Sequence, residues 1–243
     1  MNLEFDLDHI KAVEFGVGRD DGDGQVFHLL AVDVDVQGAL RDMAESTWGA
    51  MQELTHSPPR YEPSEKHASA EYVHVPLGDA LAAGMRELHN ASNISMDSTA
   101  LADPATVFCY FARMTDEKQR RLTALRRATQ FKAVLKSRFI RLVSDALKLV
   151  EDRVFKLDVD FDLLVDSRHV HILRPSGFEF VGNLQEAILT AVPKNVAAIE
   201  KDLPFVDFSG ISDYAARLGI HALPDISLLS GGRKRRRTST RVL

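Results

Sequence analysis

The first third of the chain shows two hydrophobic periodicities, one typical of strands and one typical of helices. Residues 9–36 form two alternating runs around a Gly/Asp-rich turn, which predicts an antiparallel strand pair. Residues 37–54 have apolar residues at helical spacing, and another helical segment follows Pro76. The chain is therefore predicted to open with a strand pair followed by helices.

Two segments in the middle of the chain share one layout, in which a short polar turn separates two alternating runs. These are residues 138–150, RFIRLV-SDA-LKLV, and residues 161–173, FDLLV-DSR-HVHIL. The layout favours strands for 138–174. Residues 120–137 stay open between helix and strand, because four cationic residues fall on a seven-residue series that would share one helical face. They are Arg120, Arg127, Arg141 and Lys148.

After Pro175 the hydrophobic period becomes helical. Short amphipathic helices are predicted within 178–192, 193–203 and 209–219. Residues 221–243 include the basic run GGRKRRRTSTRVL and are predicted to be a disordered tail. The expected fold class is α+β, with an N-terminal strand pair and helices, a mostly antiparallel sheet in the middle and short C-terminal helices.

Two polar stretches divide the chain. Residues 55–70 are rich in proline and serine and are predicted to be a linker or a mobile loop, and a second break ends near residue 104. We expect an N-terminal α+β region at 1–104, a core domain at 105–220 and the tail at 221–243. The first two regions are either independent or share one core.

The composition is that of a soluble globular protein, because 45% of the 243 residues are hydrophobic and 27% are charged. No apolar run approaches the roughly 20 residues that a membrane span needs. The N-terminus lacks the basic and apolar regions of a signal peptide. The single cysteine, Cys109, agrees with a reducing compartment. A cytoplasmic location is expected.

Charge is strongly segregated along the chain. Residues 1–112 hold 19 acidic and 6 basic residues, whereas residues 113–153 hold 5 acidic and 12 basic residues. Eight cationic residues between positions 120 and 141 have no acidic residue among them. We call this set the basic stripe, and its members are Arg120, Arg121, Arg126, Arg127, Lys132, Lys136, Arg138 and Arg141.

The basic stripe suits a polyanionic partner. Guanidinium groups match phosphate oxygens, and each phosphate contact releases counterions. The expected function is therefore contact with the backbone of duplex DNA, with little sequence preference. Two alternatives stay open: the stripe neutralises the acidic N-terminal half within the fold or an oligomer, or it docks on an acidic partner protein.

The segment 155–180 concentrates residues that could bind a metal ion. They are Asp158, Asp160, Asp162, Asp166, Glu179, His169 and His171. On a strand the first three would share one face, and the two histidines would share a face of the partner strand. Carboxylates in such an arrangement can hold Mg²⁺, so a metal-dependent nuclease using Asp160, Asp162 and His169 is an alternative function.

The favoured interpretation of this segment is the water-facing side of an ordinary β-hairpin. No lysine lies close to the carboxylates, and no zinc-binding spacing is present. Elsewhere, Gly16-x-Gly18 lacks a third glycine and a following helix, and no P-loop or G-x-S-x-G motif occurs. We expect no metal, no cofactor and no catalytic residue.

The segment QFKAVLKSRFIRLVSDALKLVEDRVFKLDVDFDLLVDSRHVHILRPSGFE, residues 130–179, resembles the core of the Kiwa protein B-like family. The matching features are VFKLDVDFDLLV, the apolar strand HVHIL after a short turn, and GFE at the start of a helix. The resemblance covers about residues 106–210. Beyond residues 204–208, PFVDF, family members continue with a longer ordered region, whereas this chain ends in the basic run.

The resemblance implies a role in bacterial anti-phage defence. This family supplies the cytoplasmic component of the two-gene Kiwa system, which binds phage DNA and blocks its replication or expression. It works with a membrane-embedded Kiwa component at the inner membrane, and it self-associates. The resemblance therefore implies DNA, the membrane-embedded component and further copies of this chain as partners.

Overall fold

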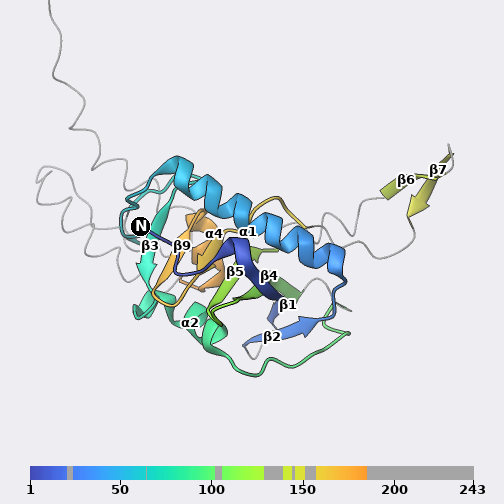
Figure 1. Cartoon of the computed structure of the whole chain (residues 1–243), viewed down its shortest axis with the longest axis horizontal. Coiled ribbons are helices and arrows are strands. Elements are labelled where there is room, and N and C mark those ends of the chain that lie inside the picture. The colour runs from blue at the N-terminus through green and yellow to red at the C-terminus, as the bar shows by residue number, and fades with distance from the viewer. Residues whose placement is uncertain are drawn as a thin grey trace, which may run out of the picture.

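The computed structural model describes residues 1–20, 24–63, 65–101, 106–128, 139–143, 146–150 and 157–184 (Figure 1). Its main feature is a seven-stranded antiparallel sheet with the order β2-β1-β4-β5-β8-β9-β3. The strands are β1 (Ile10–Asp20), β2 (Gln25–Leu30), β3 (Val73–Pro76), β4 (Val107–Asp116), β5 (Arg121–Arg127), β8 (Leu163–Val165) and β9 (His169–Ile172). The predicted α+β class is confirmed.

Strands from both sides of residue 104 build this one sheet. The central strand β4 pairs with β1 from the N-terminal region and with β5 from the later region. At the far edge, β3 from the N-terminal region pairs with β9. The regions predicted at 1–104 and 105–220 therefore contribute strands to a common sheet.

Helices cover both faces of the sheet, so the hydrophobic core has two layers. Helix α1 (Val34–Leu54) lies across one face (Figure 1), where Leu40 and Met43 pack with Phe15 and Tyr110. On the other face lie the short helix η2 (Ala80–Ala82), α2 (Ala83–Asn90) and α4 (Pro175–Val181). A further short helix, η1 (Leu7–His9), precedes β1. Because both faces are covered, the inner strands are apolar on both sides.

The predicted hairpin at 161–173 is confirmed as β8 and β9, but its predicted water-facing side is wrong. The hairpin lies inside the sheet, between β5 and β3, and all three residues of β8 are buried. On β9, His171 has no exposed surface. The alternation of polar and apolar residues in this hairpin therefore separates two faces that are both covered, and one of them holds buried polar side chains such as His171.

The second predicted hairpin is also confirmed. Strands β6 (Phe139–Val143) and β7 (Ala146–Val150) form a separate two-stranded sheet. The helical alternative is wrong for β5, β6 and β7. The predictions for residues 129–137, for the helices beyond residue 184 and for the tail at 221–243 lie outside the described residues.

Loop segments make backbone hydrogen bonds to one residue of each edge strand, His74 on β3 and Leu29 on β2. Beside β3, the Tyr61 N–H donates to the His74 carbonyl at 2.8 Å, and the His74 N–H donates to Pro59 at 3.0 Å. Beside β2, the Leu29 N–H donates to the Ser95 carbonyl at 2.9 Å. The prediction of a linker is wrong at Tyr61, which is 1% exposed. Backbone groups bonded in this way are not open to pairing with other chains.

Gly16 and Gly18 of β1 leave room for side chains of the neighbouring strand β4. This packing requirement accounts for the two glycines without a nucleotide-binding motif. A Cβ atom at Gly16 would overlap the Phe111 ring and the His28 carbonyl oxygen, and one at Gly18 would lie 2.7 Å from the Cys109 sulfur. The aromatic rings of the neighbouring strand occupy the space that side chains would need.

Gly16→Ala should destabilise the protein by about 1–3 kcal/mol, because the added methyl group overpacks the core against backbone as well as a ring. Gly49→Ala, on α1 where an added Cβ meets no atom within 4 Å, is the matched control. It should stabilise by about 0.5–1 kcal/mol. Urea unfolding of both variants checks the prediction, which fails if Gly16→Ala is as stable as the parent.

Candidate functional site

The structure describes four side chains of the basic stripe, and three of them bind groups within the protein. Arg120, just before β5, places Nε 2.7 Å from Asp116 Oδ2, and its backbone N–H donates to the other oxygen of that carboxylate. Arg121 donates from Nη1 to the carbonyls of His89 and Ala91 at the end of α2. A cation at a helix C-terminus stabilises the unpaired carbonyls there. Arg120 thus stabilises the turn between Asp116 and β5, and Arg121 stabilises the C-terminal end of α2.

Arg126 is held between two carboxylates. Its Nε lies 3.2 Å from Asp158 Oδ2, and its Nη1 lies 2.8 Å from Asp162 Oδ1. Asp162 is only 3% exposed, so its charge needs a partner within the protein. The guanidinium of Arg126 therefore neutralises the carboxylates of Asp158 and Asp162 inside the protein.

Arg127 differs from the other three. Its guanidinium carbon lies 3.9 Å from the centre of the Phe180 ring, a cation–π contact. Its Nε is buried without a hydrogen-bond partner, and among the described residues no carboxylate pairs with its side chain. Phe180 itself is 40% exposed. Within the described part of the chain, the Arg127 guanidinium therefore contacts an aromatic ring and no carboxylate.

The remaining members of the stripe are not placed by their side chains. Lys132, Lys136 and Arg138 lie outside the described residues, and Arg141 is described only through the backbone of β6. The register of this hairpin pairs Arg141 with Lys148.

The carboxylates of Asp158, Asp160 and Asp162 face arginines rather than a shared metal position. Asp160 Oδ2 lies 2.6 Å from Arg174 Nη2, and its Oδ1 accepts a hydrogen bond from Ser46 at 3.0 Å. The prediction that the three share a strand face is wrong, because β8 begins only at Leu163. Charge neutralisation by Arg126 and Arg174 decides how they point.

The pKa values of these carboxyls follow their surroundings. Burial alone would raise the pKa of Asp160, but hydrogen bonds from Arg174 and Ser46 outweigh it and lower the pKa. For Asp162 burial dominates and raises the pKa, although Arg126 opposes the shift. Burial thus outweighs the opposing charge at Asp162, whereas hydrogen bonds outweigh burial at Asp160.

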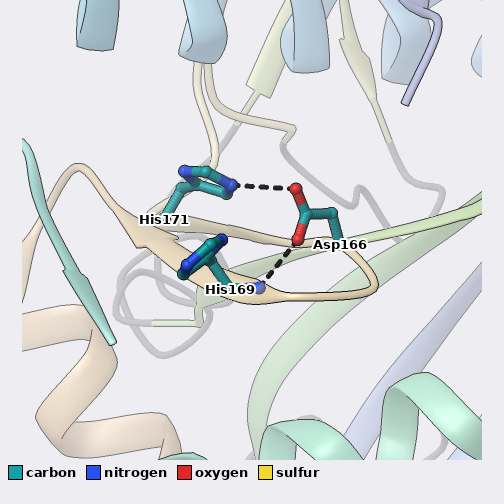
Figure 2. Close-up of side chains that lie close together, drawn as sticks. All are labelled: Asp166, His169 and His171. Carbon is teal, nitrogen blue, oxygen red and sulfur yellow. Dashed lines mark hydrogen bonds and ion pairs between the residues drawn. The ribbon is translucent and has the colours of Figure 1, made fainter. Parts of the chain in front are cut away.

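A different group brings metal-binding side chains together. Within the part of the chain that the structure describes, Asp166, His169 and His171 are the three residues whose ligand atoms all lie within 4.8 Å of one another (Figure 2). We call them the Asp-His cluster. Asp166 lies in the turn after β8, and both histidines lie on β9. Glu179, also a candidate, instead accepts a hydrogen bond from the Tyr61 hydroxyl at 2.8 Å.

Asp166 is the centre of the Asp-His cluster. Its Oδ1 accepts the N–H groups of Arg168 and His169, each at 2.8 Å, which closes the turn between β8 and β9. Its Oδ2 accepts the N–H of Glu4 at 2.8 Å and lies 3.1 Å from His171 Nε2. One carboxylate therefore joins the hairpin to the N-terminal segment.

His171 and His169 have different surroundings. The Nδ1 atom of buried His171 lies 2.8 Å from the Tyr72 hydroxyl, so Tyr72, His171 and Asp166 form a chain of hydrogen bonds. His169 is partly exposed, yet its Nδ1 is buried without a partner. The ring of His74 lies 5.6 Å from that of His169.

Burial alone would raise the pKa of Asp166, but the hydrogen bond and charge of His171, together with backbone N–H groups, hold it well below its usual range. Burial lowers the pKa of His169. At neutral pH the cluster therefore contains an ionised carboxylate and an uncharged His169.

Sequence reasoning missed Tyr72 and Glu4 as partners of the Asp-His cluster. Asp166 and Glu4 are 162 positions apart, and Tyr72 and His171 are 99 positions apart. The sequence showed Asp166, His169 and His171 close together in the chain and the two histidines on one strand face, but not their distant partners.

Comparisons with family models, curated proteins and solved structures find no match to this chain. Among the described residues, no helix is both long enough and apolar enough to cross a membrane.

Asp166→Asn should lower the free energy of unfolding by about 3 kcal/mol at pH 7, because the amide removes the negative charge and replaces with an NH2 group one of the two oxygens that accept the three backbone N–H groups. Since the folded pKa is depressed, the stability from ionised Asp166 is complete above the unfolded pKa of about 3.9 and is lost as the pH falls below it. The difference from the parent should therefore shrink towards pH 2.

Denaturant unfolding between pH 2 and pH 7 measures this difference. Asp42→Asn, at an exposed position on α1, is the control and should change stability by less than about 0.5 kcal/mol. A pH-independent difference for Asp166→Asn would contradict the assigned role.

Proposed function

We propose that the protein binds duplex DNA without cleaving it, through the part of the basic stripe that runs from Arg127 to Arg141. The observation that carries this proposal is the division of the stripe. The side chains of Arg120, Arg121 and Arg126 bind groups within the protein, whereas the side chain of Arg127 has no anionic partner among the described residues. A guanidinium without a carboxylate partner, next to an exposed ring, is suited to phosphate oxygens.

The sequence beyond Arg127 continues the same charge. Lys132, Lys136, Arg138 and Arg141 follow it, and no acidic residue lies between 127 and 141. Each phosphate that such residues contact releases counterions and strengthens binding at low salt. The contact would be to the DNA backbone and would carry little sequence preference.

The β6–β7 hairpin adds a second argument. Its register sets Arg141 directly opposite Lys148. Like charges at opposite positions of an antiparallel pair are destabilising. A phosphate group bound at this position would remove the repulsion, so the hairpin would be more stable with DNA than without it.

The biological setting of the proposal comes from the Kiwa protein B-like resemblance alone. On that basis the target is phage DNA, the protein is cytoplasmic and forms homo-oligomers, and its second partner is a membrane-embedded component. Binding would block replication or expression of the phage DNA. A non-enzymatic mechanism by occupancy agrees with carboxylates that face arginines in the 158–162 segment.

Gel-shift measurements with duplex DNA over a salt series test the interface. Replacing Lys132, Lys136 and Arg138 by Gln should weaken binding and reduce the slope of log K against log salt by about 2.7, which is about 0.9 for each lost phosphate contact. Arg127→Gln should weaken binding further.

The matched control removes the same charge from exposed positions outside the stripe, at Lys11, Lys66 and Lys118. It should leave the slope within about one contact of the parent. Equal DNA retention by the two triple variants would contradict the proposed interface.

The nuclease alternative has a direct test. Purified protein incubated with phage DNA and Mg²⁺ or Mn²⁺ should leave the DNA intact over hours, because the carboxylates at 158–162 are neutralised by Arg126 and Arg174. Gel electrophoresis reads the result. Fragments that accumulate with time in the parent but not in an Asp160→Asn, Asp162→Asn variant would overturn the occupancy mechanism.

A further inference from the structure

We propose that Asp166, His169 and His171 bind one divalent transition-metal ion of the Zn²⁺ class. This site lies on the hairpin of β8 and β9 (Figure 2) and shares no residue with the basic stripe. It goes beyond the proposed DNA binding and does not depend on it.

The separations within the Asp-His cluster suit metal coordination. Metal bonds to histidine nitrogen and carboxylate oxygen are about 2.0–2.2 Å long, so neighbouring ligand atoms of one tetrahedral ion lie about 3.3–3.6 Å apart. His171 Nε2 and Asp166 Oδ2 are 3.1 Å apart, and all three ligand atoms lie within 4.8 Å of one another. The distance between His171 Nε2 and Asp166 Oδ2 is thus within a few tenths of an ångström of the required spacing, and a ligand atom of His169 lies within 4.8 Å of both.

A metal ion at His171 Nε2 would replace the hydrogen bond between this nitrogen and Asp166, and Nε2 would give up its proton. The other ring nitrogen, Nδ1, would then carry the ring proton and donate to the Tyr72 oxygen, which lies 2.8 Å away. A polar group that orients the second ring nitrogen is typical of metal-ligating histidines.

Asp166 can bind the ion while it keeps its structural contacts. The three backbone N–H groups of Glu4, Arg168 and His169 already position the carboxylate. The lone pair of Oδ2 that faces His171 becomes free when the ring proton moves. The carboxylate is therefore preorganised by bonds that the metal does not disturb.

One feature of His169 is not explained by the hydrogen bonds around Asp166. Its Nδ1 is buried and has no hydrogen-bond partner, a cost that folded proteins usually avoid. Coordination would give this nitrogen a partner.

The ligand types select the class of metal. Two imidazoles with one carboxylate favour Zn²⁺, Co²⁺ and related ions, whereas Mg²⁺ and Ca²⁺ prefer sets made of oxygen ligands. Three protein ligands leave a further position for water or an exogenous ligand, on the partly exposed side of His169.

The experiment uses the full chain without a histidine tag. Isothermal titration with Zn²⁺ should show one site per chain, and Co²⁺ should give the visible absorption of a low-symmetry site with nitrogen and oxygen ligands. Excess Mg²⁺ should displace neither ion. Absence of binding, or displacement by Mg²⁺, would overturn the proposal.

His169→Phe is the decisive variant, because it keeps a ring at this position and removes both ligand nitrogens. The metal-free variant should unfold at the same temperature as the parent or higher, since an unpaired buried nitrogen is gone. Its Zn²⁺ affinity should fall more than about 100-fold, beyond the effect of a lost outer-sphere partner.

His74→Phe is the matched control. His74 stands opposite His171 in the β3–β9 register and its ring lies 5.6 Å from that of His169, but it is not part of the cluster. The Zn²⁺ affinity and the Co²⁺ spectrum of the His74→Phe variant should match those of the parent. Equal binding by the parent and His169→Phe, or an equal loss in His74→Phe, would refute the assigned ligands.

Discussion

Two buried carboxylates, Asp162 and Asp166, impose the constraint on which the rest of the structure depends, because a charge removed from water needs partners within the protein. Asp162 takes Arg126 and the Arg127 N–H, while its backbone carbonyl accepts the N–H groups of Leu173 and Arg174. A Cβ at Gly177 would overlap its carboxylate. One aspartate thus joins β5, the hairpin and the first turn of α4.

This constraint divides the positive charge of the basic stripe. Arg126 is needed inside for Asp162, and Arg120 and Arg121 serve a turn and a helix end. Arg120 and Arg126 thus neutralise carboxylates within the fold. Their partners are Asp116, Asp158 and Asp162, none of which belongs to the acidic N-terminal half at residues 1–112 that the open alternative named. Arg127 differs from these three, because its guanidinium lies over the Phe180 ring. The proposed DNA interface begins at that residue.

Asp166, in the turn of the hairpin, is likewise a buried carboxylate whose partners come from distant parts of the chain. It joins the turn after β8 to Glu4 and, through His171, to Tyr72 beside the Trp48 ring of α1. These bonds assemble two of the three proposed metal ligands before any ion arrives. The hairpin thus has a structural role through Asp166 and a candidate binding role through His169, whose buried nitrogen the fold leaves without a partner.

The sequence by itself determined the elements that depend on local periodicity: the β1–β2 pair, α1, and the hairpins β6–β7 and β8–β9. It also identified the clustered charges and histidines, because residue types and spacings are local properties. Only the tertiary structure decided that β8–β9 lies between β5 and β3, that Tyr61 is buried, and that Arg126 faces Asp162 from 36 positions away. Alternation states that a strand has two faces, but which face is covered depends on strands and helices distant in the chain.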